Sequence, residues 1–156
     1  MSLLPYKLEL QWTGNKGRGT EQYTSYDRSY TIRCAGKEDL HLSSDPHFRG
    51  DAGLYNPEEL LLMAAASCHM LWYLHLCADA GLIVESYHDL PTATLRIDEK
   101  GSGKFEKIEL NPSVILRAGS DPELAQALHG KANQMCFIAN SLNIKISHRP
   151  TLRISS

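Results

Sequence analysis

The side chains best suited to chemistry in this 156-residue chain are its four cysteines, Cys34, Cys68, Cys77 and Cys136. They include no closely spaced pair, the pattern that marks a zinc site or the disulfide framework of a small secreted protein. A free thiol either packs in the core as a small apolar side chain or reacts as a thiolate. The sequence around each cysteine indicates which of these two roles it has.

Cys68 lies in an unusually apolar stretch, "NPEELLLMAAASCHMLWYLHLCADAG", residues 56–81. From Leu60 to Cys77 this stretch has no Asp, Glu, Lys or Arg, and its composition predicts one long helix. A helix that is apolar on every side must be covered on every side. A domain of this size has too few strands to do so alone, and we therefore expect an obligate dimer.

The same eighteen uncharged residues reach the lower limit, about 17–25, for a helix that crosses a bilayer. However, His69, Trp72, Tyr73 and His75 fall in the middle of the stretch, whereas aromatic side chains of membrane helices gather at the two interfaces. We therefore predict a helix inside a protein and no membrane partner.

The start of this helix carries two acidic residues with different expected roles. Asn56 suits the N-cap, Pro57 the first helical position, and Glu59 completes a capping box with Asn56. Glu58 remains without such a role; it either compensates the helix dipole or serves a site. It precedes Cys68 by ten residues, about 15 Å of helix, so the two can border one pocket without touching.

The other cysteines differ in their position relative to Cys68. Cys77 follows it by nine residues, half a turn out of phase, so the two cannot form a disulfide and Cys77 is expected in the core, as is Cys34 at a strand end. Cys136 lies near the end of a second predicted helix, residues 120–142, with Asp121 or Ser120 as its N-cap. If the two helices pack at about 8–10 Å, small shifts bring Cys68 and Cys136 together.

The spacing of the residues along the chain does not support a metal site, a hydrolase dyad or a phosphate-binding loop. No Cys-x-x-Cys or His-x-x-x-His occurs, so we predict no metal. Cys68 and His69 are helix neighbours that do not face each other, which excludes a hydrolase dyad. "GNKGRGT", residues 14–20, precedes a strand and not a helix, and is expected to be a hairpin turn, not a phosphate-binding loop.

The remaining pattern predicts one α+β domain over residues 1–156, with antiparallel strands packed on two helices. Alternating apolar residues predict a hairpin from 6–12 and 21–34, a second hairpin within 92–119 and a closing strand at 144–154. Residues 43–55 are rich in turn formers and are expected to form an irregular loop.

The composition of the chain limits which partners and which cellular compartment we expect. The net charge is −2 and the 16 Lys and Arg residues are scattered, so neither a nucleic-acid stripe nor a lipid anchor is predicted. The N-terminus lacks the basic start and long apolar run of a signal peptide. We expect a cytoplasmic protein whose thiols are reduced.

Two motifs carry a resemblance to a known family. "NPEELLLMAAASC", residues 56–68, resembles the Asn-Pro-Glu-Glu-Leu…Cys helix of the OsmC/Ohr thiol peroxidases, and "CFIANSL", residues 136–142, resembles their second-cysteine motif. The order of predicted elements is similar as well. The resemblance implies a single OsmC-like domain in an intertwined homodimer, with antiparallel sheets wrapped around two long central helices. The apolar helix would then be covered by its twin.

The resemblance also implies a chemistry. Cys68 would be the peroxidatic cysteine, whose thiolate attacks an organic hydroperoxide and becomes a sulfenic acid. Cys136 would resolve it as a disulfide, which a small dithiol or a dithiol protein reduces. No haem, metal or other cofactor is implied.

A buried thiolate needs a cation, and the family supplies an arginine held by the acid that corresponds to Glu58. Arg49 of "FRGD" matches one branch of the family, and Arg18 of "KGRGT" matches the other more loosely; Arg28 is a third candidate. The residues after Cys68 are bulkier than is usual in the family, so Trp72 and Tyr73 are expected to shape the substrate pocket. The alternative is a non-catalytic small-molecule binding protein that keeps the fold and the thiol.

Overall fold

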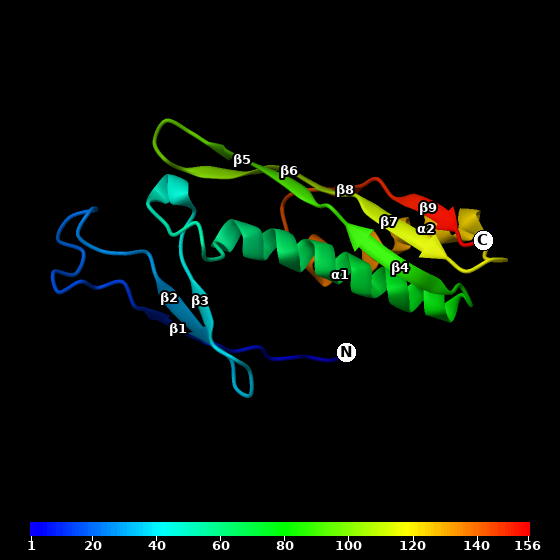
Figure 1. Cartoon of the computed structure of the whole chain (residues 1–156), viewed down its shortest axis with the longest axis horizontal. Helices are drawn as coiled ribbons and strands as arrows, with labels where there is room; N and C mark the ends of the chain where they lie inside the picture. The colour runs from blue at the N-terminus through cyan, green and yellow to red at the C-terminus, as the bar shows by residue number, and fades with distance from the viewer. The chain divides into compact units, whose positions relative to one another are not determined.

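The computed structural model describes all residues 1–156, and their contacts divide the chain into two compact units, Met1–Leu60 and Leu61–Ser156. Helix α1 (Pro57–Asp79) begins at the end of the first unit and runs into the second (Figure 1). Its predicted capping box is present. The Glu59 amide donates to Asn56 Oδ1 at 2.9 Å, and the Asn56 amide donates to Glu59 Oε2 at 3.2 Å.

The first unit contains a three-stranded antiparallel sheet in the order β1-β2-β3, made of β1 (Glu9–Trp12), β2 (Tyr30–Arg33) and β3 (Leu40–Leu42). The predicted first hairpin is therefore shorter than expected, and β3 was not predicted. The reason lies in the aromatic residues before β2. Tyr23 and Tyr26 do not extend a strand but enclose the Arg28 guanidinium, which lies 4.1 and 4.2 Å from their ring centroids.

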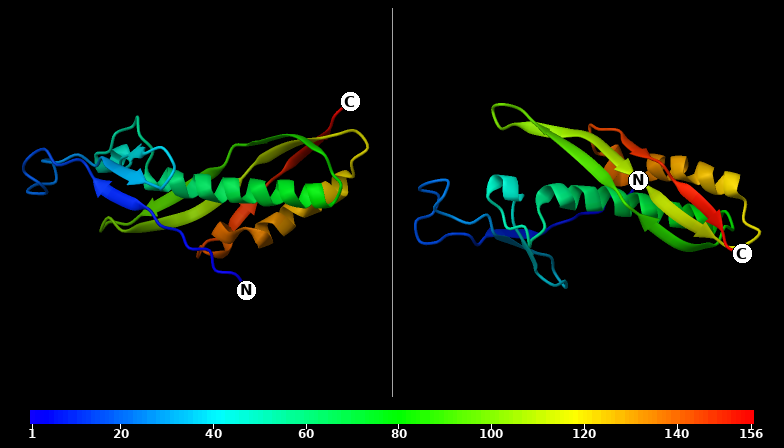
Figure 2. Two further views of the ribbon diagram at one scale, coloured as in Figure 1. Left: turned by 90° about the horizontal axis from the view of Figure 1, so that it is seen from below. Right: turned by 45° about the horizontal axis from the view of Figure 1, so that its top comes forward.

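The second unit contains two three-stranded sheets, ordered β4-β7-β9 and β5-β6-β8 (Figure 2). Their strands are β4 (Val84–Asp89), β5 (Thr92–Ile97), β6 (Gly103–Leu110), β7 (Pro112–Leu116), β8 (Ile146–His148) and β9 (Thr151–Ile154). The predicted second hairpin is β5 with β6, and its turn contains Gly101, whose φ of 81° lies in the left-handed region.

The sequence predicted that all strands are antiparallel, but two strand pairs are parallel. Strand β8 runs parallel to β6, and β9 runs parallel to β7. The predicted closing strand is split by Arg149 and Pro150, because Pro150 has no N–H to continue a ladder and the chain crosses there from one sheet to the other. Strand β4 was also missed.

The long helices lie against these sheets in the second unit. Tyr73 and Cys77 of α1 share one core with Ala125 and Ala132 of α2 (Pro122–Met135) and with buried side chains of the β4-β7-β9 sheet. Ala65 of α1 belongs to a second core with apolar residues of β6 and β8. Asp121 is the N-cap of α2, since its Oδ1 accepts hydrogen bonds from the amides of Glu123 and Leu124.

Only one stripe of α1 is buried, and it consists of Ala65, His69, Tyr73 and Cys77 at every fourth position. By length and composition α1 could cross a membrane, with a mean hydropathy of 1.5 over eighteen residues of which 22% are buried. A core helix of a soluble protein has the same length and apolar composition. Leu71 on another side of α1 is 61% exposed. A single chain therefore leaves much of this apolar helix uncovered.

Candidate functional site

The two cysteines of the sequence motifs meet in the second unit. Cys68 projects from α1, and Cys136 lies at a break between α2 and the short helix α3 (Phe137–Asn140). The break corrects the prediction of one continuous helix over residues 120–142. Cys136 has an extended backbone, with φ −67° and ψ 112°, and its Sγ accepts a hydrogen bond from the Ala139 amide at 3.3 Å. The break thus leaves Cys136 held as the N-cap of α3.

The two thiols lie close enough for Cys68 to influence the pKa of Cys136, and their environments distinguish them. Burial raises the pKa of the Cys136 thiol, and the hydrogen bond with Cys68 raises this pKa further. The amides of Ala139 and Ile138 act against this rise because they stabilise the Cys136 thiolate. Cys136 is 1% exposed, whereas Cys68 is partly accessible. Burial and the neighbouring Cys68 thus both favour the protonated form of Cys136, and Cys68 is the more accessible sulfur.

The other two cysteines lie elsewhere. Cys77 is in the core as predicted, and burial raises the pKa of its thiol. The prediction that Cys34 is a core residue is wrong: it follows the last residue of β2, is half-buried, and borders an open hollow of about 480 Å³ together with Arg33 and Asp39. It lies just beyond the end of the central strand of a small three-stranded sheet.

The aromatic residues expected at a substrate pocket differ in accessibility. Trp72, one turn after Cys68, is half-buried and meets the ring of Phe137 edge to face at 5.6 Å between centroids. Phe137 directly follows Cys136 and is 66% exposed. Tyr73 is completely buried and stacks on His129, so the expectation that it contacts substrate needs correction. Trp72 and Phe137 are the apolar rings beside the two thiols.

The charged candidates lie in the first unit, and they differ in how they are engaged. Arg18 forms an exposed ion pair with Glu21 at 2.7 Å, and Arg28 is enclosed by two tyrosine rings. Arg49 is exposed and forms no ion pair. It is also the only non-glycine residue with positive φ, at 64°. Such a backbone is unfavourable by on the order of 1–3 kcal/mol and tends to occur at functional sites.

Glu58 is half-buried in the first turn of α1 and makes no ion pair with Arg49. Its carboxylate is close enough to Tyr30 of β2 to raise the pKa of that phenol, an effect that adds to the larger one of burial. Glu58 therefore faces the sheet of its own unit.

Two buried histidines and one half-buried histidine form a cluster in the second unit that was not predicted from the sequence. They are His69 of α1, His129 of α2 and His148 of β8. A signal was present, because His69 and His129 occupy the apolar phase of their helices, in the series Ala65-His69-Tyr73 and Ala125-His129-Ala132. Spacing rules for metal ligands missed them, since the residues come from three distant elements.

Residues 50–149 match the family of OsmC-like proteins. This chain belongs to that family. An OsmC-like protein of unknown function from Vibrio cholerae is 27% identical, with 96% of this chain and 100% of that chain superposed at a TM-score of 0.83. The α+β fold predicted from the sequence is thereby confirmed as OsmC-like.

Two further proteins resemble this OsmC-like chain. An organic hydroperoxide resistance protein from Elizabethkingia anophelis shares the fold, with a TM-score of 0.70, 19% identity, and coverage of 98% of this chain and 100% of that chain. The uncharacterized protein YmaD of Bacillus subtilis is 28% identical over 104 residues, which are 64% of this chain and 69% of that protein.

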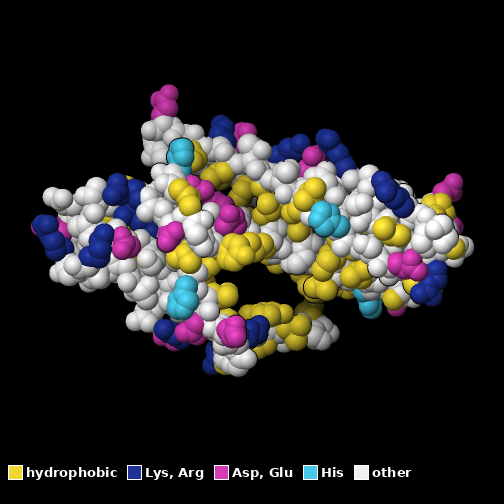
Figure 3. Space-filling model, in the orientation of Figure 1, with side chains coloured by type: hydrophobic (Ala, Val, Ile, Leu, Met, Phe, Trp, Pro, Cys, Tyr) yellow, Lys and Arg dark blue, Asp and Glu magenta, His cyan; other side chains and the backbone are white.

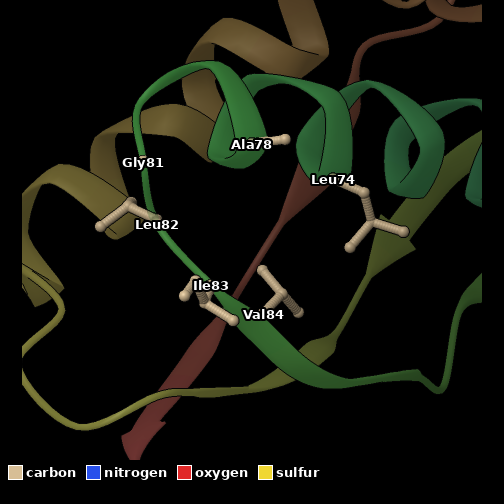
Figure 4. A pocket seen from close by; sticks show the side chains of 6 residues that line it. All are labelled: Leu74, Ala78, Gly81, Leu82, Ile83 and Val84. Carbon is tan, nitrogen blue, oxygen red and sulfur yellow. The ribbon is translucent and has the colours of Figure 1, made fainter.

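The surface of this OsmC-like chain carries mixed charges on one face and an apolar hollow beside α1. On the face drawn in Figure 3, Lys and Arg side chains are interspersed with Asp and Glu. At the C-terminal end of α1, an apolar hollow of about 490 Å³ opens between the helix and β4 (Figure 4). Its lining includes Leu74 and Ala78 of α1 and Val84 of β4, but neither thiol of the Cys68–Cys136 pair.

Proposed function

We propose that this OsmC-like protein is a cytoplasmic thiol peroxidase that reduces organic hydroperoxides to alcohols. The observation that carries the proposal is the contact between the accessible Cys68 sulfur and the buried, protonated Cys136 thiol. An attacking sulfur and a reserve thiol are the two parts that such a reaction requires.

The proposed reaction has three steps. The Cys68 thiolate attacks the O–O bond, an alkoxide leaves and takes up a proton to become the alcohol, and Cys68 becomes a sulfenic acid. Cys136 then attacks the Cys68 sulfur, water leaves and a disulfide forms. A small dithiol or a dithiol protein restores both thiols by exchange. The Ala139 amide supports the second step, since it stabilises negative charge on Cys136 Sγ.

The substrate class follows from the rings beside the thiols. Trp72 and the exposed Phe137 offer an apolar surface that favours a hydroperoxide with an apolar tail over hydrogen peroxide. The E. anophelis protein of the same fold is named for organic hydroperoxide resistance.

Titration of the reduced protein with cumene hydroperoxide tests the function. One equivalent of peroxide is expected to be consumed with the loss of two of the four thiols and to leave Cys68 joined to Cys136, as peptide mapping would show. The alternative is a binding protein with the same fold. It would leave all four thiols and the peroxide unchanged, and that result would overturn the proposal.

We further propose that Arg49 is the cation that stabilises the Cys68 thiolate and that Glu58 orients it. The support is the family resemblance, the free guanidinium of Arg49 and its left-handed backbone. Arg49→Ala is expected to slow sulfenic acid formation by roughly tenfold to a hundredfold, because the charge is lost. Glu58→Ala removes only its orientation and should have a smaller effect. Stopped-flow mixing with peroxide measures this step.

Arg18→Ala is the matched control for Arg49→Ala, because Arg18 is another exposed loop arginine of the first unit and is already paired with Glu21. It should react at the rate of the unaltered protein. An effect of Arg18→Ala equal to that of Arg49→Ala would contradict the assignment of the cation to Arg49.

We also propose that a second copy of the chain covers the open sides of α1. Leu71 at 61% and Met63 at 42% exposure lie on this helix, and the apolar hollow adjoins its end. Folding and dimerisation are then inseparable, and dilution in sedimentation experiments should yield no folded monomer. Leu71→Asp should abolish folding or dimerisation, whereas Glu99→Asp in the β5–β6 turn should not. A monomer that melts cooperatively would exclude this assembly.

A further inference from the structure

Besides their shared apolar core, α1 and the segment from α2 to Cys136 are joined by two side-chain bridges that lie close together. One is the thiol pair, Cys68 with Cys136. The other joins His69 Nε2 to His129 Nδ1 at 3.1 Å, and both imidazoles are at most 1% exposed. His69 directly follows Cys68 on α1, and His129 of α2 precedes by seven residues Cys136, which directly follows the end of α2. Helix α1 thus contributes one histidine and one cysteine, and α2 with the residue that follows it contributes the other two.

The geometry identifies the histidine bridge as a hydrogen bond. The planes of the two rings are nearly parallel, with an angle of 8° between them, and the ring centroids are 5.4 Å apart. This separation is close to the 3.1 Å between the nitrogens plus the two ring radii, so the nitrogens point directly at each other. One imidazole donates its N–H and the other accepts along its lone pair. Two lone pairs directed at one metal ion would need the rings to be turned.

The surroundings keep the bridge in one place. The Tyr73 ring stacks on His129 at 3.8 Å and 11°, and it lies one turn after His69 on the same helix. The His148 ring of β8 lies 5.4 Å from His69 between centroids. His129 contacts two residues of α1, His69 and Tyr73. Rotation or sliding of α2 past α1 would therefore break the hydrogen bond between the two histidines. Such a movement would also change the distance between Cys68 and Cys136.

We propose that the His69–His129 hydrogen bond is a positioning device for the Cys68–Cys136 pair, which holds the two sulfurs where a disulfide can form. This role deepens the proposed peroxidase function, and it rests on that function for its use in the second step of the reaction. Neither histidine contacts the reacting sulfurs in this role; both act by fixing the helices. Disulfide geometry is strict, so a small displacement of one helix makes the bond harder to form.

The test measures disulfide formation without peroxide. In a glutathione redox buffer, Cys68 and Cys136 lose two electrons and two protons to oxidised glutathione, which becomes two reduced molecules. His129→Phe keeps a ring for Tyr73 to stack on but removes the hydrogen bond. We expect its equilibrium constant for the Cys68–Cys136 disulfide to fall roughly tenfold. His129→Asn keeps a polar atom near the position of Nδ1 and should restore most of the loss.

Two controls separate positioning from general destabilisation. His75→Phe alters an exposed histidine of the same helix and should leave the equilibrium constant unchanged. Ile108→Val weakens a core that contains neither bridge, so it should lower the melting temperature but not the equilibrium constant.

The possible outcomes also separate this inference from the proposed function. If peroxide is not consumed but the disulfide constant falls in His129→Phe, the peroxidase function fails and the positioning role stands. If peroxide is consumed and His129→Phe forms the disulfide as readily as the unaltered protein, the positioning role is overturned and the function stands. An effect of Ile108→Val as large as that of His129→Phe would also overturn it.

Discussion

Cys68→Ser should abolish peroxide consumption, whereas Cys136→Ser should consume one equivalent and then stop. The asymmetry follows from the two environments. Cys68 is the accessible sulfur, and Cys136 is buried with its proton retained by burial and by the hydrogen bond to Cys68. A buried, protonated thiol is a poor first nucleophile, because only the thiolate attacks the peroxide. Without Cys68, Cys136 should therefore remain reduced at stoichiometric peroxide.

The trapped state gives the sharper measurement. In Cys136→Ser the Cys68 sulfenic acid has no partner thiol, so a dimedone-type reagent should label Cys68, and mass spectrometry would locate the label. Cys68→Ser should show no label on any residue.

Cys77→Ser and Cys34→Ser are the matched controls, and both should turn over almost normally. Cys77 lies in the core, where burial raises the pKa of its thiol, and Cys34 belongs to the first unit at the end of β2. Labelling of Cys77 equal to that of Cys68, or full activity in Cys68→Ser, would show that the chemistry is assigned to the wrong sulfur.

Helix α1 could be predicted from the sequence because its signals are local. Asn56, Pro57 and Glu59 form the cap within four residues, and the following run contains no helix breaker. The pairing of Cys68 with Cys136 came from the resemblance to a family, and spacing alone left it open. The family motif also placed Cys136, but not the backbone break at this residue. "QMCFIAN" contains neither Gly nor Pro, so nothing local announces that α2 ends at Met135.

The topology of the sheets and the histidine cluster could not be predicted for a common reason. A period of two identifies a strand but not its partner, so the parallel pairing of β8 with β6 was not predictable. His69 and His129 are 60 residues apart, and their contact depends on how α1 and α2 pack. Tertiary packing decides both features, and one sequence read by local pattern does not contain it.

The histidine cluster leads to the second large effect, a loss of stability in mild acid. Burial lowers the pKa of His69 to about 4, with a smaller contribution from His148. Burial, and then the neighbouring His69 and His148, lower the pKa of His129 to about 3. Burial and then Lys145 lower the pKa of His148. In the unfolded chain each of these imidazoles returns to a pKa of about 6.5.

The direction of the effect follows from these values. Above about pH 6.5 the histidines are neutral in both states, and stability does not depend on them. As the pH falls from about 6.5 towards 4, the unfolded chain binds protons that the folded chain does not, so the free energy of unfolding decreases. Each pH unit in this window removes up to about 1.36 kcal/mol per histidine, which is large against a total of about 5–15 kcal/mol.

The other titratable groups around the cluster change this pH dependence of stability only slightly. The phenols of Tyr73 and Tyr87 have raised pKa values and stay neutral in acid. Burial raises the pKa of the Asp89 carboxyl, so its protonation favours the folded state as the pH falls. This single carboxyl opposes two or three histidines. Exposed carboxylates such as Glu85, whose pKa is lowered mainly by its hydrogen bond with Arg117, lose their contribution only below about 4.5.

Urea unfolding at pH 7, 6, 5 and 4 measures the effect, and the midpoint should fall most steeply between pH 6 and 4. His129→Phe should show a shallower fall, because one histidine no longer binds a proton on unfolding. His75→Phe should keep the full slope, since His75 is an exposed residue of α1 beside Asp79. A midpoint that stays constant from pH 7 to pH 5 would mean that the folded protein accepts protons on these imidazoles. Their hydrogen bond would then not survive as a bond between neutral rings.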